Sequence, residues 1–178
     1  MNELTFPTLE AVLRDFVRDV GAEYAAVIAR NDHNASHNLS NTATSADAQK
    51  VTVVTGGYEV SLDLPKYWKY IEHGLAPGGK YGNPGWKAYP AIRRWIDIKP
   101  VIPRPGRNGR IPTPNQLAYL ITRKIVNEGT TGTHDLATAR DATLPEYMDR
   151  IADALQKDAE GYILKVMEPG TTVIETEL

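Results

Sequence analysis

The stretch "KPVIPRPGRNGRIPT", residues 99–113, most strongly limits how this chain can fold. It contains four prolines and two glycines, which exclude a continuous helix or strand there. Residues 75–90 are also rich in glycine and proline, so the segment between the two loops can hold only a short element. At 178 residues, with 42% hydrophobic and 24% charged residues, the chain suits one domain with a modest core.

Apolar residues recur at helical spacing near both ends of the chain. The stripe that begins at Leu9 predicts a helix over residues 8–30 with Thr8 as its N-cap. A second stripe predicts a helix from Leu144 to about Met167, with Pro145 in its first turn. Shorter helical segments are predicted at 36–42 (one turn), 66–73, 90–98 and 113–129.

Two β-rich runs surround a pair of glycines in "KVTVVTGGYEVSLDL". They predict a hairpin with strands near 50–55 and 58–63 and a turn at Gly56-Gly57. We therefore expect an α+β fold, in which a small antiparallel β-sheet is packed by a long N-terminal and a long C-terminal helix and joined by long Pro/Gly loops.

The loops and the C-terminal residues complete this picture. We expect "TTGTHDLATARDAT", residues 130–143, to be a loop, and residues 99–113 to be an exposed one, since their cations resist burial. The expected domain covers residues 1–168. Residues 169–178, with strand-like alternation, are expected to leave it as an arm that adds a strand to a neighbouring chain.

The net charge of −2 hides a strongly uneven distribution. Residues 66–124 carry twelve basic and two acidic side chains, whereas residues 1–65 carry four and nine and residues 125–178 carry four and eleven. A basic centre thus lies between two acidic flanks. It could serve an anionic partner, contacts between copies, or neutralisation within the fold.

Sequence motifs typical of catalysis or metal binding are weak in this chain. The chain has no cysteine, which excludes disulfides and thiolate sites, and it has no nucleophile-elbow motif. His33 and His37 have a metal-like spacing in a polar loop without further ligands, so we expect no metal, no cofactor and no catalytic residue. The N-terminus does not resemble a signal peptide and no apolar run has membrane-spanning length.

All three tryptophans lie between residues 67 and 96, within a segment rich in glycine and proline. Trp, Tyr and Arg are the residue types enriched at protein–protein hot spots, so this segment predicts a docking surface. Alternatively, Trp68 and Trp95 cover the core from their short helices. The interface candidates are Tyr67, Trp68, Tyr70, Tyr81, Trp86, Arg93, Arg94, Arg104, Arg107 and Arg110.

The order of motifs over residues 8–140 resembles the bacteriophage tail-completion and neck proteins, the connectors between head and tail. A "Tyr-x-x-Tyr-x-Glu-x-Gly" motif is followed by an "Ile-x-x-Trp-Ile" helix and a helix that ends in "Glu-Gly-Thr". Two local features differ from the family: His37 replaces a usual glycine, and the proline-rich insert is longer. The matching residues are Tyr67, Tyr70, Glu72 and Gly74; Ile92, Trp95 and Ile96; and Ala118, Tyr119, Ile121, Glu128, Gly129 and Thr130.

The resemblance implies a structural virion protein rather than an enzyme. It implies a homo-oligomeric ring, of six or twelve copies, between portal or adaptor proteins and the tail, with DNA passing through the lumen without specific binding. The chain would then reside at the head–tail junction of the virion, and in the host cytoplasm during assembly. The alternative is a nucleic-acid-binding module that uses the central arginines on phosphates.

Overall fold

The computed structural model describes residues 6–31, 37–79, 85–99, 101–106 and 109–167. It is a mixed helix and sheet fold. Its helices are α1 (Pro7–Arg30), α2 (Asn38–Ala43), α3 (Trp68–His73), α4 (Tyr89–Ile98), α5 (Pro114–Glu128) and α6 (Asp135–Met167), with 3₁₀ turns η1 (Pro77–Gly79) and η2 (Gly85–Ala88). The strands are β1 (Gln49–Val54), β2 (Gly57–Leu62), β3 (Gly74–Leu75) and β4 (Thr130–Thr131).

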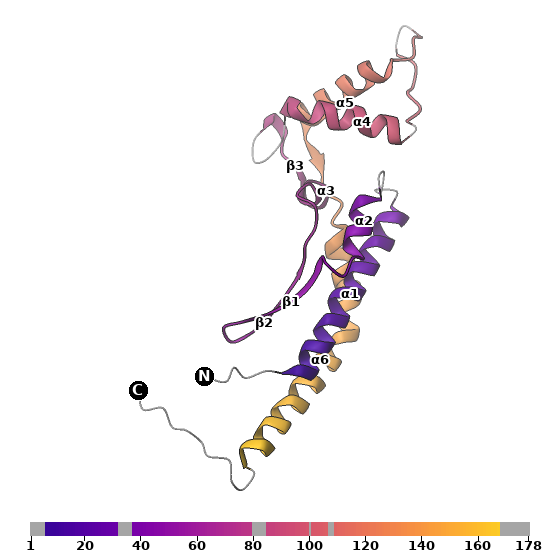
Figure 1. Ribbon diagram of the computed structural model, residues 1–178. Helices are drawn as coiled ribbons and strands as arrows, with labels where there is room; N and C mark the ends of the chain where they lie inside the picture. The colour runs from indigo at the N-terminus through magenta and orange to yellow at the C-terminus, as the bar shows by residue number, and fades with distance from the viewer. Residues whose placement is uncertain (1–5, 32–36, 80–84, 100, 107–108, 168–178) are drawn as a thin grey trace.

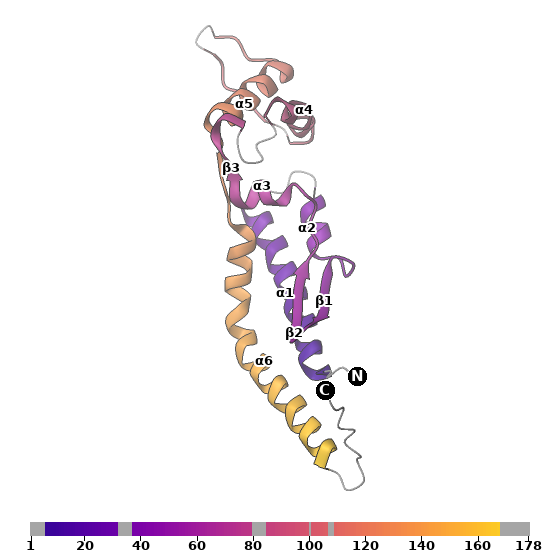
Figure 2. The same ribbon diagram turned by 90° about the vertical axis from the view of Figure 1, so that its left-hand side faces the viewer.

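Two long helices, α1 and α6, form the central part of the molecule. α1 and α6 run antiparallel and pack along one another, and the β1–β2 hairpin lies on the other side of α1 (Figures 1 and 2). The expected α+β arrangement, a small antiparallel sheet with long terminal helices, is confirmed. The last turns of α6 extend past the start of α1, because α6 has 33 residues and α1 has 24.

The hydrophobic core lies where the second half of α1 meets α2, α3 and the beginning of α6. Its largest buried side chains are Tyr24 and Ile28 of α1. Trp68 of α3 and Leu136 of α6 pack against this cluster from its edge. The predicted stripe of α1 is thus confirmed as its buried face.

The hairpin forms as expected, with its turn one residue earlier. Val54 pairs with Gly57, so Thr55 and Gly56 form the turn, and Gly57 is already in the strand. Only Gly56 of the two glycines has a positive φ, of 86°. One left-handed residue is therefore enough to close this turn, and the prediction that both glycines form it was wrong.

A two-stranded ribbon connects the helical pair to the rest of the chain. Gly74 pairs with Thr131 and Leu75 with Thr130. The ribbon therefore joins residues that are 57 and 55 positions apart in the sequence. Gly74 and Gly129 both have positive φ, and a Cβ on either would lie only 2.2 Å or 2.1 Å from a carbonyl oxygen of the opposite segment. The ribbon therefore requires glycine on both sides of the crossing.

α6 begins at Asp135, nine residues before the predicted start. The expected loop over 130–143 is wrong beyond its first residues, and Pro145 lies inside the helix rather than at its start. The reason is a cap from a distant segment: the carboxylate of Glu72 accepts the backbone N–H groups of Leu136 and Ala137 at 2.9 and 3.0 Å. This satisfies first-turn donors that local sequence leaves without a cap.

α1 begins one residue before the predicted start, and Thr8 is not its N-cap. Pro7 occupies the first helical position and Phe6 the cap position, without a side-chain cap. The carboxylate of Asp158, from α6, instead accepts the backbone N–H of Leu9 at 2.8 Å. Each long helix thus receives a carboxylate from elsewhere in the fold at its N-terminus.

Residues 85–128, here called the distal module, lie beyond the ribbon (Figure 1). α4 and α5 pack against each other there, with Ile96, Ala118 and Thr122 buried. α5 has the predicted ends: Thr113 forms a capping box with Gln116, and Gly129 terminates the helix. The module is therefore a small packed unit at one end of an elongated molecule.

Candidate interaction surfaces

An aromatic pair marks the surface of the distal module. Trp86 of η2 stacks on Tyr119 of α5, with ring centroids 5.2 Å apart and ring planes 29° apart. Both side chains remain about half exposed, at 49% and 48%. The neighbouring Leu120 is 50% exposed, so the helix presents a flat apolar surface to its surroundings.

An open groove of about 770 Å³ adjoins this pair. One wall is the loop that carries Arg104 and Arg110, and the other is the first half of α5 with Tyr119 and Leu120. Ile111 of the loop also lines the groove and is 65% exposed. The groove therefore combines two cations with exposed apolar side chains.

The described part of the 99–113 loop is exposed for most of its length, as expected. Ile102 is 91% exposed, which is extreme for an isoleucine. A backbone hydrogen bond of 2.9 Å from the N–H of Gly106 to the carbonyl of Arg110 draws the two ends of the loop tip together. This bond holds Gly106 and Arg110 close together, and the side chain of Arg110 is exposed.

The predicted interface residues fall into two separate places. Tyr67, Trp68 and Tyr70 lie at α3, beside the core and the base of the ribbon, whereas Trp86 belongs to the distal module. Trp68 is half-buried against the core, and its ring contacts that of His73 at 5.8 Å, while Tyr67 and Tyr70 are partly exposed.

The arginines of the distal module differ in their surroundings. Arg93 donates to Asn115 Oδ1 at 2.7 Å and forms an ion pair with Asp97 of its own helix, which makes it part of the α4–α5 contact. Arg94, Arg104 and Arg110 are exposed. Tyr81 and Arg107 lie outside the described residues.

A further apolar surface, at the end of α6, was missed. The sequence predicted that Tyr162, Ile163 and Val166 form the packed stripe of the helix, but they are 51%, 54% and 39% exposed. Leu164 and Met167 are exposed as well, at 68% and 75%. The helical period was visible in the sequence, whereas the earlier start of α6 and its register against α1 were features of the fold.

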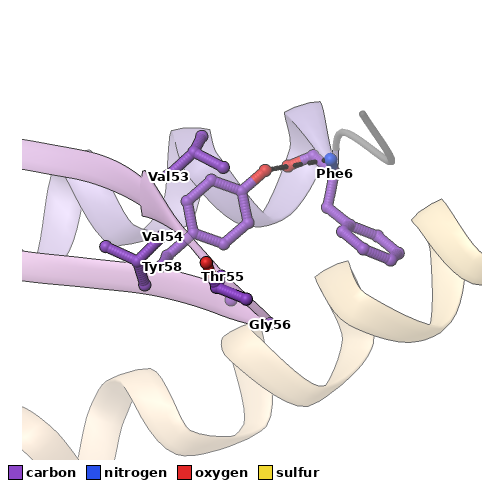
Figure 3. Close-up of a pocket in the computed structure, with 7 residues that line it drawn as sticks. Phe6, Val53, Val54, Thr55, Gly56 and Tyr58 are labelled. Atoms are coloured by element: carbon purple, nitrogen blue, oxygen red, sulfur yellow. Dashed lines mark hydrogen bonds between the residues drawn. The ribbon is translucent and has the colours of Figure 1, made fainter. Parts of the chain in front are cut away.

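The hairpin end forms a second recess, of about 740 Å³, between β1, β2 and Phe6 (Figure 3). The Tyr58 hydroxyl accepts the backbone N–H of Phe6 at 2.9 Å and donates to its carbonyl oxygen at 3.2 Å. Val53 and Val54 are 46% and 40% exposed beside it. This contact fastens the hairpin to the start of α1.

A buried polar cluster lies where α6 begins. Asp135 is 1% exposed and accepts hydrogen bonds from Asn31 at 2.8 Å and from Thr133 at 2.9 Å. Burial raises the pKa of Tyr24, and the charges of Glu72 and Asp135 raise it further. The Tyr24 hydroxyl is a buried atom without a hydrogen-bond partner among the described residues. The enclosed cluster positions the start of α6.

Metal sites and membrane-spanning helices are two further kinds of functional feature. Within the described ranges, no three His, Asp or Glu side chains gather as metal ligands; His33 lies outside these ranges. The helices described in the structure include none that is both long and apolar enough to cross a bilayer.

Comparison of this chain with protein-family models, with curated proteins and with solved structures gives no match.

Proposed function

We propose that this chain is a structural subunit of a bacteriophage head–tail junction, where copies form a ring that joins portal-side proteins to the tail. The observation that carries the proposal is the presence of different apolar surfaces at the two ends of an elongated molecule. One is the Trp86–Tyr119 surface of the distal module, and the other is the exposed end of α6. Contacts between unlike surfaces are heterologous, and they generate rings when the rotation closes.

The residues that carry the family resemblance also support the proposal. Glu72 and Gly74, from one motif, meet the segment that contains Gly129 and Thr130, from another. These residues build the crossing that holds the distal module relative to the helical pair. The motifs thus share one structural task, which explains physically why they would occur together and in this order.

In this function the neighbours of the ring are portal or adaptor proteins on one side and tail proteins on the other. DNA passes through the lumen without specific binding, and six or twelve copies close the ring. The subunit acts by binding and sealing, and it needs neither catalysis nor a cofactor. It is made in the host cytoplasm and ends at the head–tail junction of the virion.

The experiment is cryo-electron microscopy of the neck of the virion, with mass spectrometry of purified particles. We expect the chain as a closed ring, with Trp86 at a boundary between subunits or partners. Absence of the chain from virions, or a fully solvent-facing Trp86–Tyr119 surface in the assembled ring, contradicts the proposal.

A pair of variants tests the α6 surface in the particle. Tyr162→Ser with Ile163→Ser removes exposed apolar area without opening the core, so we expect a folded chain that fails to enter particles. The matched control is Gln156→Ser with Lys157→Ser, two exposed polar positions on the same helix. Equal incorporation of both variants contradicts a role for this surface.

A nucleic-acid-binding module remains the second candidate, because Arg104 and Arg110 are exposed in a groove at the surface. Binding through phosphates weakens steeply as salt is raised. Titration of duplex and single-stranded DNA at about 50 and about 200 mM salt distinguishes the two functions. The module function predicts tight binding at the lower salt that weakens steeply at the higher salt and that Arg104→Glu abolishes, whereas the ring function predicts weak binding that Arg104→Glu changes little.

A further inference from the structure

The two ends of the molecule carry opposite charge as well as different apolar surfaces. The distal module, residues 85–128, has nine basic and two acidic side chains, a net charge of +7. The end of α6 lies at the other end of the molecule, and the sequence from there on, residues 153–178, has two basic and six acidic side chains, a net charge of −4. Opposite charge at opposite ends favours head-to-tail association of copies and disfavours head-to-head contacts.

The last eleven residues have the composition that the groove of the distal module requires. Residues 168–178 contain three glutamates and no basic residue, interleaved with Val173, Ile174 and Leu178. The groove offers Arg104 and Arg110 beside exposed Ile111 and Leu120. Carboxylates can therefore reach guanidinium groups while neighbouring aliphatic side chains cover apolar surface. A phosphate backbone would match the arginines but would leave the apolar side chains exposed.

The reach of the chain decides whether this contact is within one copy or between two. α6 has 33 residues, which corresponds to about 50 Å along its axis. The distal module lies beyond the other end of α6 (Figures 1 and 2). Eleven residues span at most about 40 Å when fully extended. Residues 168–178 therefore cannot reach the groove of their own copy, and the occupant must come from a second one.

We propose that residues 168–178 of one copy bind the groove of the next copy, between Arg104, Arg110 and Ile111 on one side and α5 on the other. The glutamates contact Arg104 and Arg110, and Val173 and Ile174 cover Ile111 and Leu120. As a contact between neighbours, this joint rests on the proposed ring. It names the partner of the distal module as a second copy of this chain, and it assigns the acidic segment as the ligand.

Binding of a fluorescently labelled peptide of residues 168–178 to the full chain tests the joint directly. Fluorescence anisotropy is measured at protein concentrations where the chain is monomeric, so that its own C-terminal residues leave the grooves empty. We expect saturable binding that weakens as salt is raised, because the contact is partly electrostatic. Arg104→Glu with Arg110→Glu should weaken it by at least about tenfold, since two charge-assisted contacts are lost and replaced by like-charge repulsion.

The matched control is Arg123→Glu with Lys124→Glu. It changes the net charge by the same amount at exposed positions of α5 that do not line the groove. We expect peptide binding within about twofold of the unaltered chain. A peptide with Glu175→Lys and Glu177→Lys should lose binding to the unaltered chain and regain it on the charge-reversed groove. Circular dichroism of each protein variant checks that the fold is retained.

Three results would overturn the joint. These are no saturable binding of the peptide at concentrations where the chain is monomeric, equal weakening by both pairs of variants, or failure of the reversed peptide to bind the reversed groove. Displacement of the peptide by duplex DNA that itself binds more tightly, and that loses affinity with Arg104→Glu, would identify the groove as a nucleic-acid site instead. Since the peptide assay needs no virion, failure of the joint and failure of the ring proposal are separate results.

Discussion

Glu72 is the side chain on which the connection between distant parts of the chain depends most directly. It is 3% exposed, and both of its carboxylate oxygens accept backbone N–H groups of α6. Its own backbone carbonyl accepts the N–H of His134 at 3.2 Å. One residue therefore fixes where α6 begins and how the β4 segment enters it.

Replacement of this carboxylate should be costly. We expect Glu72→Ala to lower the free energy of unfolding by about 2–4 kcal/mol, because two buried N–H groups lose charged acceptors. Urea denaturation followed by circular dichroism measures the change. Glu146→Ala, at an exposed position of α6, should stay within about 0.5 kcal/mol. Equal effects of the two would show that the cap contributes little.

Gly74 and Gly78 form a natural comparison at the ribbon, since both have a φ of 73°. A Cβ on Gly74 would lie 2.2 Å from the Thr130 carbonyl oxygen, whereas Gly78 has open space. We expect Gly78→Ala to cost about 1–2 kcal/mol, the price of a left-handed alanine. Gly74→Ala should cost clearly more, because its ψ of −167°, against 19° at Gly78, places it in a region that is essentially restricted to glycine, and because the Cβ adds the backbone clash. The shift in the urea midpoint measures both costs. Similar costs would mean that the ribbon can open to admit a methyl group.

At the scale of elements, the sequence predicts those structures whose signals are local. The Thr113 capping box and Gly129 set the ends of α5, and the single turn after His37 is present as α2. The start of α6 was missed because its cap comes from Glu72, more than sixty positions earlier. A proline such as Pro145 marks a helix start in most sequences, and only a tertiary contact shows that this helix has already begun.

The candidate surfaces, like the elements, were predicted only where the signal is local to the sequence. Trp86 was selected from its residue type in a loop, and the structure leaves it half exposed. Its partner Tyr119 was known only as part of a helix motif, because stacking between η2 and α5 depends on how the module folds. The exposed end of α6 was interpreted as a packed stripe, since amphipathic periodicity does not show which part of the helix lies against its partner.

The cap on α1 makes a prediction about acid stability. Burial acts to raise the pKa of Asp158, but hydrogen bonds from Thr8 and the backbone N–H of Leu9 outweigh it, so the pKa lies below its ordinary value. A lowered pKa gives stability that is present above the unfolded value of about 3.9 and is lost as pH falls through the folded value. Asp158→Ala should therefore destabilise the chain at pH 7 and lose less additional stability below about pH 4. Denaturant midpoints of Asp158→Ala and of the unaltered chain, measured between about pH 2.5 and about pH 7, should approach each other at the acid end. A constant difference between the two curves would contradict this prediction.

At the scale of the whole molecule, the elongated shape follows from the ribbon. The distal module continues beyond the long helices instead of folding back on them (Figures 1 and 2). A compact chain of this length has a radius of gyration of about 16 Å. We expect a clearly larger value from small-angle X-ray scattering of the monomer. A value near that of a compact protein would mean that the distal module packs onto the helical pair in solution.

The pairing of Leu75 with Thr130 has a consequence for how such a chain can change over time. The two residues that bracket positions 76–129 are direct neighbours across an antiparallel ribbon, at a spacing that a two-residue turn can close. The segment between them thus has the topology of an insertion, entering and leaving the host fold at one point. Recombination at this point could exchange the distal module for another segment while α1, α6 and the hairpin keep their contacts. Subunits of this architecture could in that way acquire new neighbours without redesigning the scaffold that carries them.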